Sequence, residues 1–304
     1  MTLTENLLQK TSRTFALTIP FLPEPTRREV EVAYLLFRIV DTFEDASLWA
    51  PARRIDVMTR FVDALEQAPS ACEGLVDACA REPPVKHPGY LELLAKMRPV
   101  LERYAGLRSP ARGSIRRHVT RSANAMIEFV RRSDGEGRLA LTTLDELRRY
   151  CYAVAGIVGE MLTELYLLGR PELEWAADGL RSRSARFGEG LQLVNILKDA
   201  RGDADEGRTY LPPQVPLADV LATVADDLAA ATEYVELLRE AGTEPGLVAF
   251  NAAISRLARA NLDLFETRGL GAKLSRLDVA RIQAEVVREL ERREATLRAL
   301  SHHG

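Results

Sequence analysis

Apolar side chains recur every three or four residues along almost the whole chain, and this period constrains the fold more than any other feature. Between Pro25 and Asp45, for example, Val30, Tyr34 and Phe37 lie on one stripe of a helix that begins just after the proline. The alternation of a half-buried strand and the turn pairs of β-hairpins are missing. The sequence therefore predicts an all-α protein.

The predicted helices are separated by short polar or proline-containing segments. They span residues 25–45, 51–65, 89–104, 110–131, 144–168, 175–198, 217–241, 247–265 and 277–299, with a connection containing one short helix at 69–88. We find no internal repeat, and expect residues 1–304 to form a single helical domain. Gly156 and Gly159 lie inside an apolar helix, where they permit either close helix packing or a break beside a cavity.

Charge and cysteine content narrow the classes of function. The net charge of −3 gives no electrostatic reason for nucleic acid as a partner, so an anionic ligand needs a local basic cluster or a metal ion. The cysteines Cys72, Cys79 and Cys151 leave at least one thiol unpaired, which favours a reducing compartment. No apolar run approaches the ~20 residues that span a bilayer, and the first residues lack a secretory signal. We expect a cytoplasmic protein without a transmembrane segment, and peripheral membrane association stays open.

Two short acidic motifs lie far apart in the sequence, each at the end of an apolar helix. Asp41, Glu44 and Asp45 share one helical face, and Asp199 and Asp203 share another. Like charges at this spacing repel, and acidic side chains at a helix C-terminus oppose its macrodipole. Together the motifs indicate that a bound cation neutralises these carboxylates, and such hard oxygen ligands suit Mg²⁺. Solvated helix ends are the alternative interpretation.

Amide and basic side chains surround the second motif. Gln192, Asn195 and Asp199 lie on one helical face, where the amides can orient the ligands of a metal ion. Arg208 follows in a glycine-containing loop, and its guanidinium can bind a diphosphate through two hydrogen bonds. This neighbourhood is therefore a candidate site for a metal ion and an anionic substrate.

Five segments resemble, in order and rough separation, the motifs of the squalene/phytoene synthase family. They are residues 12–15, 34–45, 150–156, 192–203 and 207–212, so the resemblance covers roughly residues 8–215. It implies a class I isoprenoid synthase fold, a helical bundle around a central apolar cavity. It also implies that the two acidic motifs face each other across the mouth of the cavity and bind Mg²⁺.

The resemblance assigns a role to each matching residue. It implies that the metal ligands are Asp41, Glu44, Asp45, Asn195, Asp199 and Asp203. It implies that the substrate-binding residues are Ser12, Arg13, Arg38, Gln192, Asn195 and Arg208, with Arg38 and Arg208 on diphosphate oxygens. Asp41 and Asp199 would also be catalytic, and Tyr34 with one of Tyr150 or Tyr152 would line the reacting centre.

The implied reaction is a prenyl transfer between two farnesyl diphosphates. They condense head to head to a cyclopropyl (presqualene) diphosphate, which NADPH reduces to squalene; phytoene or dehydrosqualene formation without reduction is the alternative. The first motif, Asp-Thr-Phe-Glu-Asp, is similar to the squalene synthase pattern, although Ala46 stands where another acid is common in those enzymes. No dinucleotide-binding glycine motif follows a strand, so NADPH is implied by the resemblance alone. Prenyl chain length and oligomeric state are not readable from the sequence.

Two alternative functions are also compatible with paired acidic motifs on a helical fold. Chain-elongating prenyltransferases and terpene cyclases also use paired acidic motifs, but the tyrosine-rich segment 150–156 and the segment 207–212 argue against them. A non-catalytic helical scaffold that retains the fold is an alternative from another class. The intact acids of both motifs argue against a scaffold.

Overall fold

The computed structural model describes residues 1–12, 14–134, 138–205 and 210–301, with the side chains of these residues except 201, 203–205 and 296–301. Its helices are α1 (Leu3–Thr11), α2 (Thr14–Thr18), α3 (Thr26–Glu44), α4 (Pro51–Ala64), α5 (Glu73–Arg81), α6 (Pro88–Ala95), α7 (Met97–Ala105), α8 (Ser109–Arg132), α9 (Leu144–Cys151), α10 (Ile157–Leu167), α11 (Ala177–Asp205), α12 (Leu217–Glu240), α13 (Pro245–Arg268) and α14 (Arg276–Ser301). Between them lie the 3₁₀ turns η1 (Ile19–Phe21), η2 (Pro69–Cys72) and η4 (Pro171–Leu173), and the π-helical segment η3 (Tyr152–Gly156). No strand occurs among the described residues, which confirms the predicted all-α class.

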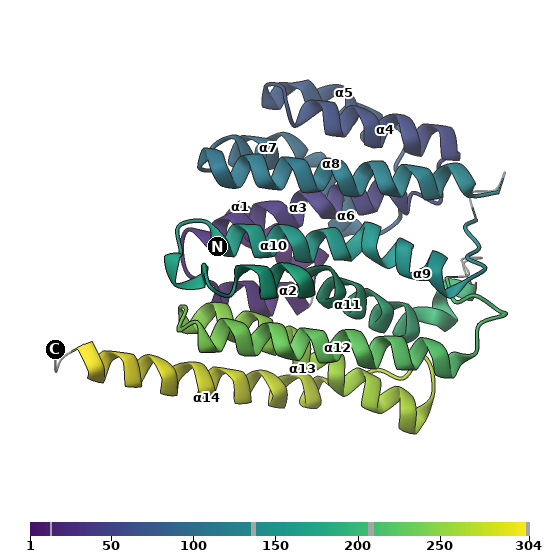
Figure 1. Cartoon of the computed structure of the whole chain (residues 1–304). Helices are drawn as coiled ribbons and strands as arrows, with labels where there is room; N and C mark the ends of the chain where they lie inside the picture. Colours follow the sequence, from purple (N-terminus) through teal and green to yellow (C-terminus); the bar gives the residue numbers. More distant parts are fainter. Residues whose placement is uncertain (13, 135–137, 206–209, 302–304) are drawn as a thin grey trace.

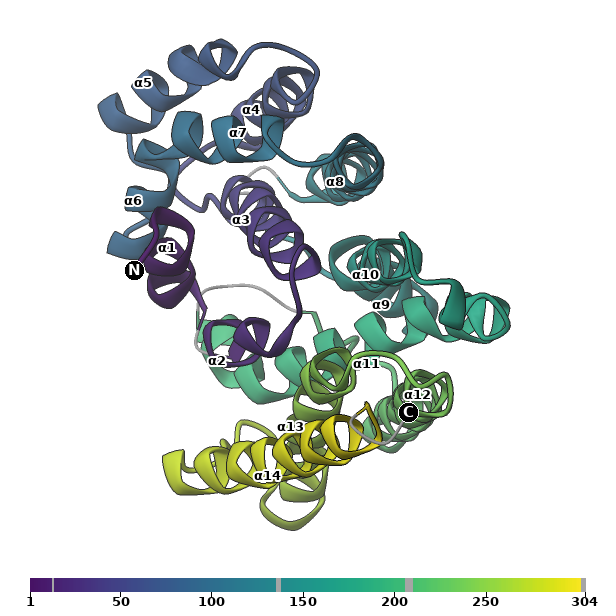
Figure 2. The same ribbon diagram turned by 90° about the vertical axis from the view of Figure 1, so that its left-hand side faces the viewer.

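The long helices lie side by side in layers, from α4 and α5 at one edge to α14 at the other (Figure 1). Viewed along these helices, α3 is enclosed by α1, α6, α7, α8 and α10 (Figure 2). A second group follows, in which α11 packs against α10 and α12, and α13 packs against α12 and α14. The helices that carry the two acidic motifs, α3 and α11, therefore belong to neighbouring parts of one bundle.

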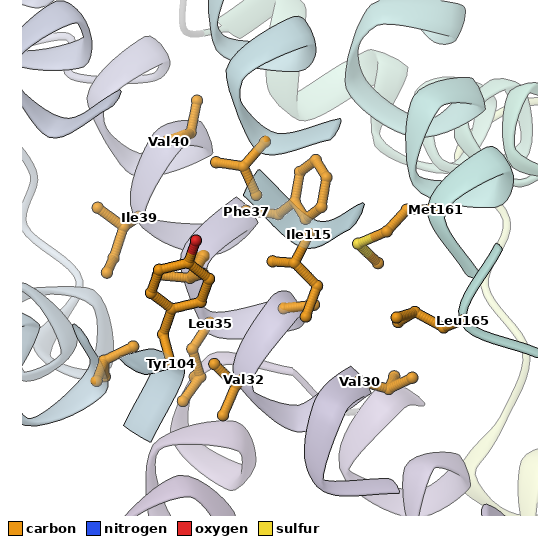
Figure 3. Packing of buried hydrophobic residues seen from close by; sticks show 14 of the residues in the cluster. Val30, Val32, Leu35, Phe37, Ile39, Val40, Tyr104, Ile115, Met161 and Leu165 are labelled. Atoms are coloured by element: carbon orange, nitrogen blue, oxygen red, sulfur yellow. The ribbon is translucent and has the colours of Figure 1, made fainter. Parts of the chain in front are cut away.

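Most residues of helix α3 are buried, and most of these buried residues are apolar. Figure 3 shows its side chains meeting residues of α7, α8 and α10; the labelled residues are Val30, Val32, Leu35, Phe37, Ile39, Val40, Tyr104, Ile115, Met161 and Leu165. Interiors packed in this way resist displacement of a single element. The packing therefore gives the acidic end of α3 a fixed position.

Two of the predicted helices are interrupted in the structure. Residues 89–104 form two helices, α6 and α7, with a break at Lys96. Pro99 explains the break, because proline has no N–H for the carbonyl of Ala95 and its ring clashes with that carbonyl. The stretch 144–168 is divided by the π-helical segment η3. The connection 69–88 contains one α-helix, α5, as predicted, together with the turn η2.

Glycines allow α11 to pack backbone against backbone on η3 and α10. A Cβ atom on Gly159 would lie 2.0 Å from the carbonyl oxygen of Ser184, and one on Gly188 would lie 2.0 Å from that of Ala155. Gly156 ends the π-helical segment. Both predicted uses of these glycines, close packing and a break in the helix, therefore occur together.

The described residues contain no helix that is long and apolar enough to cross a membrane. Cys72, Cys79 and Cys151 are all buried and form no disulfide. The single-domain organisation and the cytoplasmic location stay predictions.

Candidate active site

Two adjoining cavities lie between α3, α11 and α13. The first, which we call the mouth, has a volume of about 530 Å³ and polar walls that include Ser12, Arg38, Asp41, Glu44, Asp45, Tyr90, Tyr150, Gln192, Asn195, Lys198 and Asp199. The second, the apolar chamber, has a volume of about 170 Å³ and walls that include Tyr34, Phe37, Phe187, Tyr234 and Phe250. The two share walls at Phe15, Arg38, Asp41, Val154, Leu191, Gln192, Asn195 and Ile254. A polar mouth thus leads directly into an apolar interior.

The first acidic motif lines the mouth from the end of α3. Glu44 is buried beside Arg54, whose guanidinium donates to the Glu44 backbone carbonyl and lies 3.9 Å from its carboxylate. The N–H of Asp45 closes the last turn of this helix on the carbonyl of Asp41 at 2.8 Å. Burial raises the pKa of Asp41 to about 6, with Arg38 opposing the shift and Asp45 adding to it. Such a carboxyl gains most from a nearby cation.

Arg38 lies at the junction of the mouth and the apolar chamber. Its Nε donates to the hydroxyl of Tyr34 at 3.3 Å, and its Nη1 lies 3.5 Å from a carboxylate oxygen of Asp41. The centre of the guanidinium lies 5.5 Å from the ring centroids of both Tyr34 and Tyr90. Tyr34 itself donates to the carbonyl of Thr11 at 2.9 Å, which fixes its ring against the end of α1.

Asp199 of the second acidic motif lines the mouth from α11, together with Gln192 and Asn195. The ammonium of Lys198 donates to Oδ1 of Asn195 at 2.6 Å and lies 3.8 Å from Asp199. The other carboxylate oxygen of Asp199 accepts from Lys273 at 2.9 Å. Burial lowers the pKa of Lys198, with Asp199 opposing this and Lys273 adding to it. Asp199 thus lies between two cationic side chains.

The two candidate tyrosines of the segment 150–156 lie in different places. Tyr150 lines the mouth, with its ring stacked on Tyr210 at 4.9 Å between centroids. Burial raises the pKa of the Tyr150 phenol, and the nearby carboxylate of Glu44 raises it further. The Tyr152 hydroxyl instead donates to Glu160 at 3.1 Å and accepts from Arg121 at 2.7 Å, and Tyr152 lines neither cavity. The structure therefore places Tyr150, and not Tyr152, at the site.

Of the remaining predicted residues, two line the cavities and the others fall outside the described part of the chain. Ser12 lines the mouth, and its hydroxyl accepts from the N–H of Phe15 at 3.0 Å. Arg13 and Arg208 lie outside the described residues, as does the side chain of Asp203. Tyr34 lines the apolar chamber. The structure thus brings the other predicted ligands of both motifs to one cavity.

The carboxylates fit a magnesium site that substrate phosphates help to complete, rather than one formed by protein ligands alone. Among the described side chains, no group of three His, Cys, Asp or Glu residues converges closely enough to enclose a metal ion. The mouth instead presents Asp41, Glu44 and Asp45 from α3, and Asp199 from α11. Mg²⁺ typically binds through one or two carboxylates, several waters and the phosphates of its substrate. The donor set is of this kind.

Sequence reasoning missed Tyr90, Lys198 and Lys273 as site residues. Tyr90 comes from α6 and Lys273 from the loop before α14, and neither belongs to a motif. Lys198 lies within the segment 192–203, directly before Asp199. A positive charge beside a predicted metal ligand was the sequence signal for it. For the other two, the sequence carried no signal, because their contacts connect distant segments.

Known proteins resemble this chain in sequence. Residues 8–300 match the family model described as squalene/phytoene synthase. The squalene synthase of Eremothecium gossypii is 28% identical over 74% of this chain and 47% of its own length. The squalene synthase of Dictyostelium discoideum is 30% identical over 69% of this chain and 46% of its own length. The chain therefore spans about half the length of the curated relatives it matches.

Solved structures share the fold. A structure of TcSQS with the ligand BPH1237 superposes with a TM-score of 0.76 at 26% identity, over 93% of this chain and 85% of that chain. A dehydrosqualene synthase superposes with a TM-score of 0.51 at 19% identity, over 95% of each chain. At that identity, the second likeness concerns the helical architecture alone.

Proposed function

The chain belongs to the squalene/phytoene synthase family, and from this membership we propose that it is a prenyltransferase that condenses two prenyl diphosphates head to head. Farnesyl diphosphate is the proposed substrate, with a cyclopropyl diphosphate as intermediate and squalene as product. The named squalene synthases among the relatives support this choice of product.

One observation carries the proposal. The first motif and Asp199, from helices far apart in the sequence, line the same polar mouth, and that mouth adjoins the apolar chamber. A prenyl diphosphate has the same division into a charged head and an apolar tail. The mouth can accept the diphosphate while the chamber accepts the hydrocarbon.

The mechanism follows from what these side chains can do. Asp41, Glu44, Asp45 and Asp199 would hold magnesium, which would supply positive charge to the leaving diphosphate so that the allylic C–O bond can ionise. Arg38 binds the released diphosphate through guanidinium hydrogen bonds. The apolar walls exclude water from the prenyl cation, which the double bond of the second substrate then attacks. The rings of Tyr34 and Tyr150 line the two cavities, where aromatic faces stabilise positive charge.

The fate of the cyclopropyl diphosphate determines the product. After a second ionisation and rearrangement, hydride transfer from NADPH gives squalene, and loss of a proton gives dehydrosqualene. We propose the reductive route, because the Asp-Thr-Phe-Glu-Asp motif is similar to that of squalene synthases. NADPH is therefore part of the proposal as a co-substrate.

Incubation of the purified protein with farnesyl diphosphate and Mg²⁺, with and without NADPH, tests the proposal. Mass spectrometry should find squalene only when NADPH is present. Dehydrosqualene formed regardless of NADPH would retain the condensation and reject the reductive step. Absence of any hydrocarbon or cyclopropyl product from folded protein, with geranylgeranyl diphosphate also tried, would favour the non-catalytic scaffold.

Peripheral contact with a membrane is a further part of the proposal, because the product is an apolar hydrocarbon. Flotation with liposomes, with and without substrate, tests it. Protein that stays in the dense fraction under both conditions would contradict membrane contact and leave the reaction unaffected.

A further inference from the structure

Tyr90 contacts the proposed diphosphate-binding arginine from a helix that carries neither acidic motif. It is the third residue of α6, and its ring centroid lies 5.5 Å from the guanidinium carbon of Arg38. The ring of Tyr34 lies at the same distance, 5.5 Å. We propose that Tyr90 is a positioning residue that holds Arg38 in the orientation in which it binds the substrate diphosphate. This inference rests on the proposed function.

The need for positioning follows from the surroundings of Arg38. Its side chain is only 26% exposed, and burial of a guanidinium is costly unless other groups compensate. Two aromatic faces at 5.5 Å and the carboxylate of Asp41 at 3.5 Å compensate for this burial. The side chain is long, with many rotamers, and Asp41 at 3.5 Å attracts it away from any ligand. The aromatic faces of Tyr34 and Tyr90 attract the guanidinium without occupying its N–H donors as a carboxylate does.

The position of Tyr90 is itself fixed by the packing of α6 on α1. A Cβ atom on Gly89 would lie 2.4 Å from the carbonyl oxygen of Lys10, so the two backbones touch at the residue before Tyr90. The ammonium of Lys10 also donates to both carboxylate oxygens of Glu92 at 2.8 Å. The ring of His87 packs on Tyr90, with centroids 4.2 Å apart. These contacts leave the ring of Tyr90 little freedom to move away from Arg38.

The ring, rather than the hydroxyl, makes this contact. Within the described part of the chain, no hydrogen-bond partner is found for the hydroxyl of Tyr90, although the residue lines the mouth. Phenylalanine at this position therefore retains the interaction with Arg38, and leucine removes it. A tyrosine that bound substrate through its hydroxyl would lose that contact equally in both variants.

Calorimetric binding of farnesyl thiodiphosphate, an unreactive substrate analogue, with Mg²⁺ tests the inference. Tyr90→Leu should weaken binding by about 3- to 30-fold, the range expected for loss of one cation–π contact. Tyr90→Phe should restore the dissociation constant to within about threefold of the wild type. In an Arg38→Met background, Tyr90→Leu should have no further effect, because Tyr90 acts through Arg38. Tyr104→Leu removes a tyrosine that lines neither cavity of the site, and serves as the control.

Two results would overturn the inference. Equal weakening by Tyr90→Phe and Tyr90→Leu would assign the effect to the hydroxyl. An undiminished effect of Tyr90→Leu in the Arg38→Met background would make Tyr90 a direct ligand. Thermal unfolding of each variant identifies any weakening that comes from loss of the fold.

A measurement without substrate separates this inference from the proposed function. The Nε–H resonance of Arg38 in an NMR spectrum reports its hydrogen bond to Tyr34 and the rings beside it. It should shift in Tyr90→Leu and return close to the wild-type position in Tyr90→Phe. An unchanged resonance in Tyr90→Leu would reject positioning even if the wild type makes squalene. A wild type that binds no analogue and forms no product would reject the function, whatever the resonance shows.

Discussion

The ammonium of Lys273 lies 2.9 Å from a carboxylate oxygen of Asp199, 74 residues earlier in the chain. The loop that carries Lys273 is held against α11, because the N–H of Gly271 donates to the carbonyl of Leu197 at 3.1 Å. A lysine therefore lies where the proposed magnesium ligand would meet its ion. This ammonium offsets part of the negative charge of Asp199.

Lys273→Met should increase the affinity of the substrate-free protein for a divalent cation. The ammonium competes with the ion for Asp199, but both side chains are well exposed, at 63% and 44%, so the gain is modest. We expect a two- to fivefold lower dissociation constant for Mn²⁺, in line with ~0.5–1 kcal/mol for an exposed ion pair. Mn²⁺ binding is measured by electron paramagnetic resonance, with Lys96→Met as a control for net charge. Equal affinities in the two variants would contradict the competition.

Asp41→Asn and Asp199→Asn should each reduce product formation by on the order of 100- to 1,000-fold, because each removes charge that would hold the metal and diphosphate. Thermal unfolding should change little for Asp199, which is partly exposed. Asp56→Asn alters an exposed carboxylate paired with Arg60 at 3.4 Å, and should leave activity unchanged. A scaffold without catalysis would predict no difference among the three variants.

Tyr150→Leu should lower product formation by about 5- to 30-fold, because it removes an aromatic face that stabilises positive charge at the mouth. Tyr152→Leu should stay within about twofold of the wild type, because Tyr152 lines neither cavity and its hydroxyl contacts Arg121 and Glu160. Steady-state assays of farnesyl diphosphate consumption decide between the two tyrosines. A greater loss for Tyr152→Leu would reverse the assignment made from their positions.

Gly159→Ala should destabilise the fold by about 2 kcal/mol, because its methyl group would meet the Ser184 carbonyl at 2.0 Å and force the two backbones apart. Gly113→Ala is a matched change inside α8, where the nearest atom lies 3.9 Å away. It should stabilise the protein by up to about 1 kcal/mol through helix propensity. Urea unfolding measures both free energies. Similar effects of the two substitutions would argue against backbone contact at Gly159.

Stability should fall as the pH decreases below about 6.5, and His118 should contribute to this loss. Its Nδ1 donates to the Ser114 carbonyl at 2.8 Å, and burial lowers its pKa from 6.5, although Glu164 opposes the shift. The unfolded chain therefore binds a proton at a higher pH than the folded chain does. Above pH 6.5 the imidazole is neutral in both states and causes no loss of stability. As the pH falls from 6.5 toward the folded pKa, protonation of the unfolded chain lowers the free energy of unfolding by at most about 1.4 kcal/mol per pH unit.

The variant His118→Gln isolates this effect. The difference in free energy of unfolding between the wild type and the variant should shift in favour of the variant as the pH falls. Arg121 and Glu160 also face His118, with opposite effects on its charge, and both remain in the variant. A constant difference between pH 7.5 and 5 would show that His118 does not titrate differently in the two states.

The sequence determined the helices and the acidic faces, because both depend on neighbours within one or two turns. The stripe of Val30, Tyr34 and Phe37 predicted α3, and the spacing of Asp41, Glu44 and Asp45 predicted their common face. The motif order also predicted the family, and the match of residues 8–300 to the family model confirms it. The break between α6 and α7 was missed although Pro99 marked it.

The tertiary structure decided which faces meet. Tyr150 and Tyr152 lie too close in sequence to face the same way on a helix, and only the packing of η3 and α11 shows that Tyr150 faces the mouth. Likewise, the contacts of Tyr90 with Arg38 and of Lys273 with Asp199 join segments with no local relation. Helix formation is governed by hydrogen bonds four residues apart, whereas such contacts depend on the packing of whole helices, to which every residue of the core contributes.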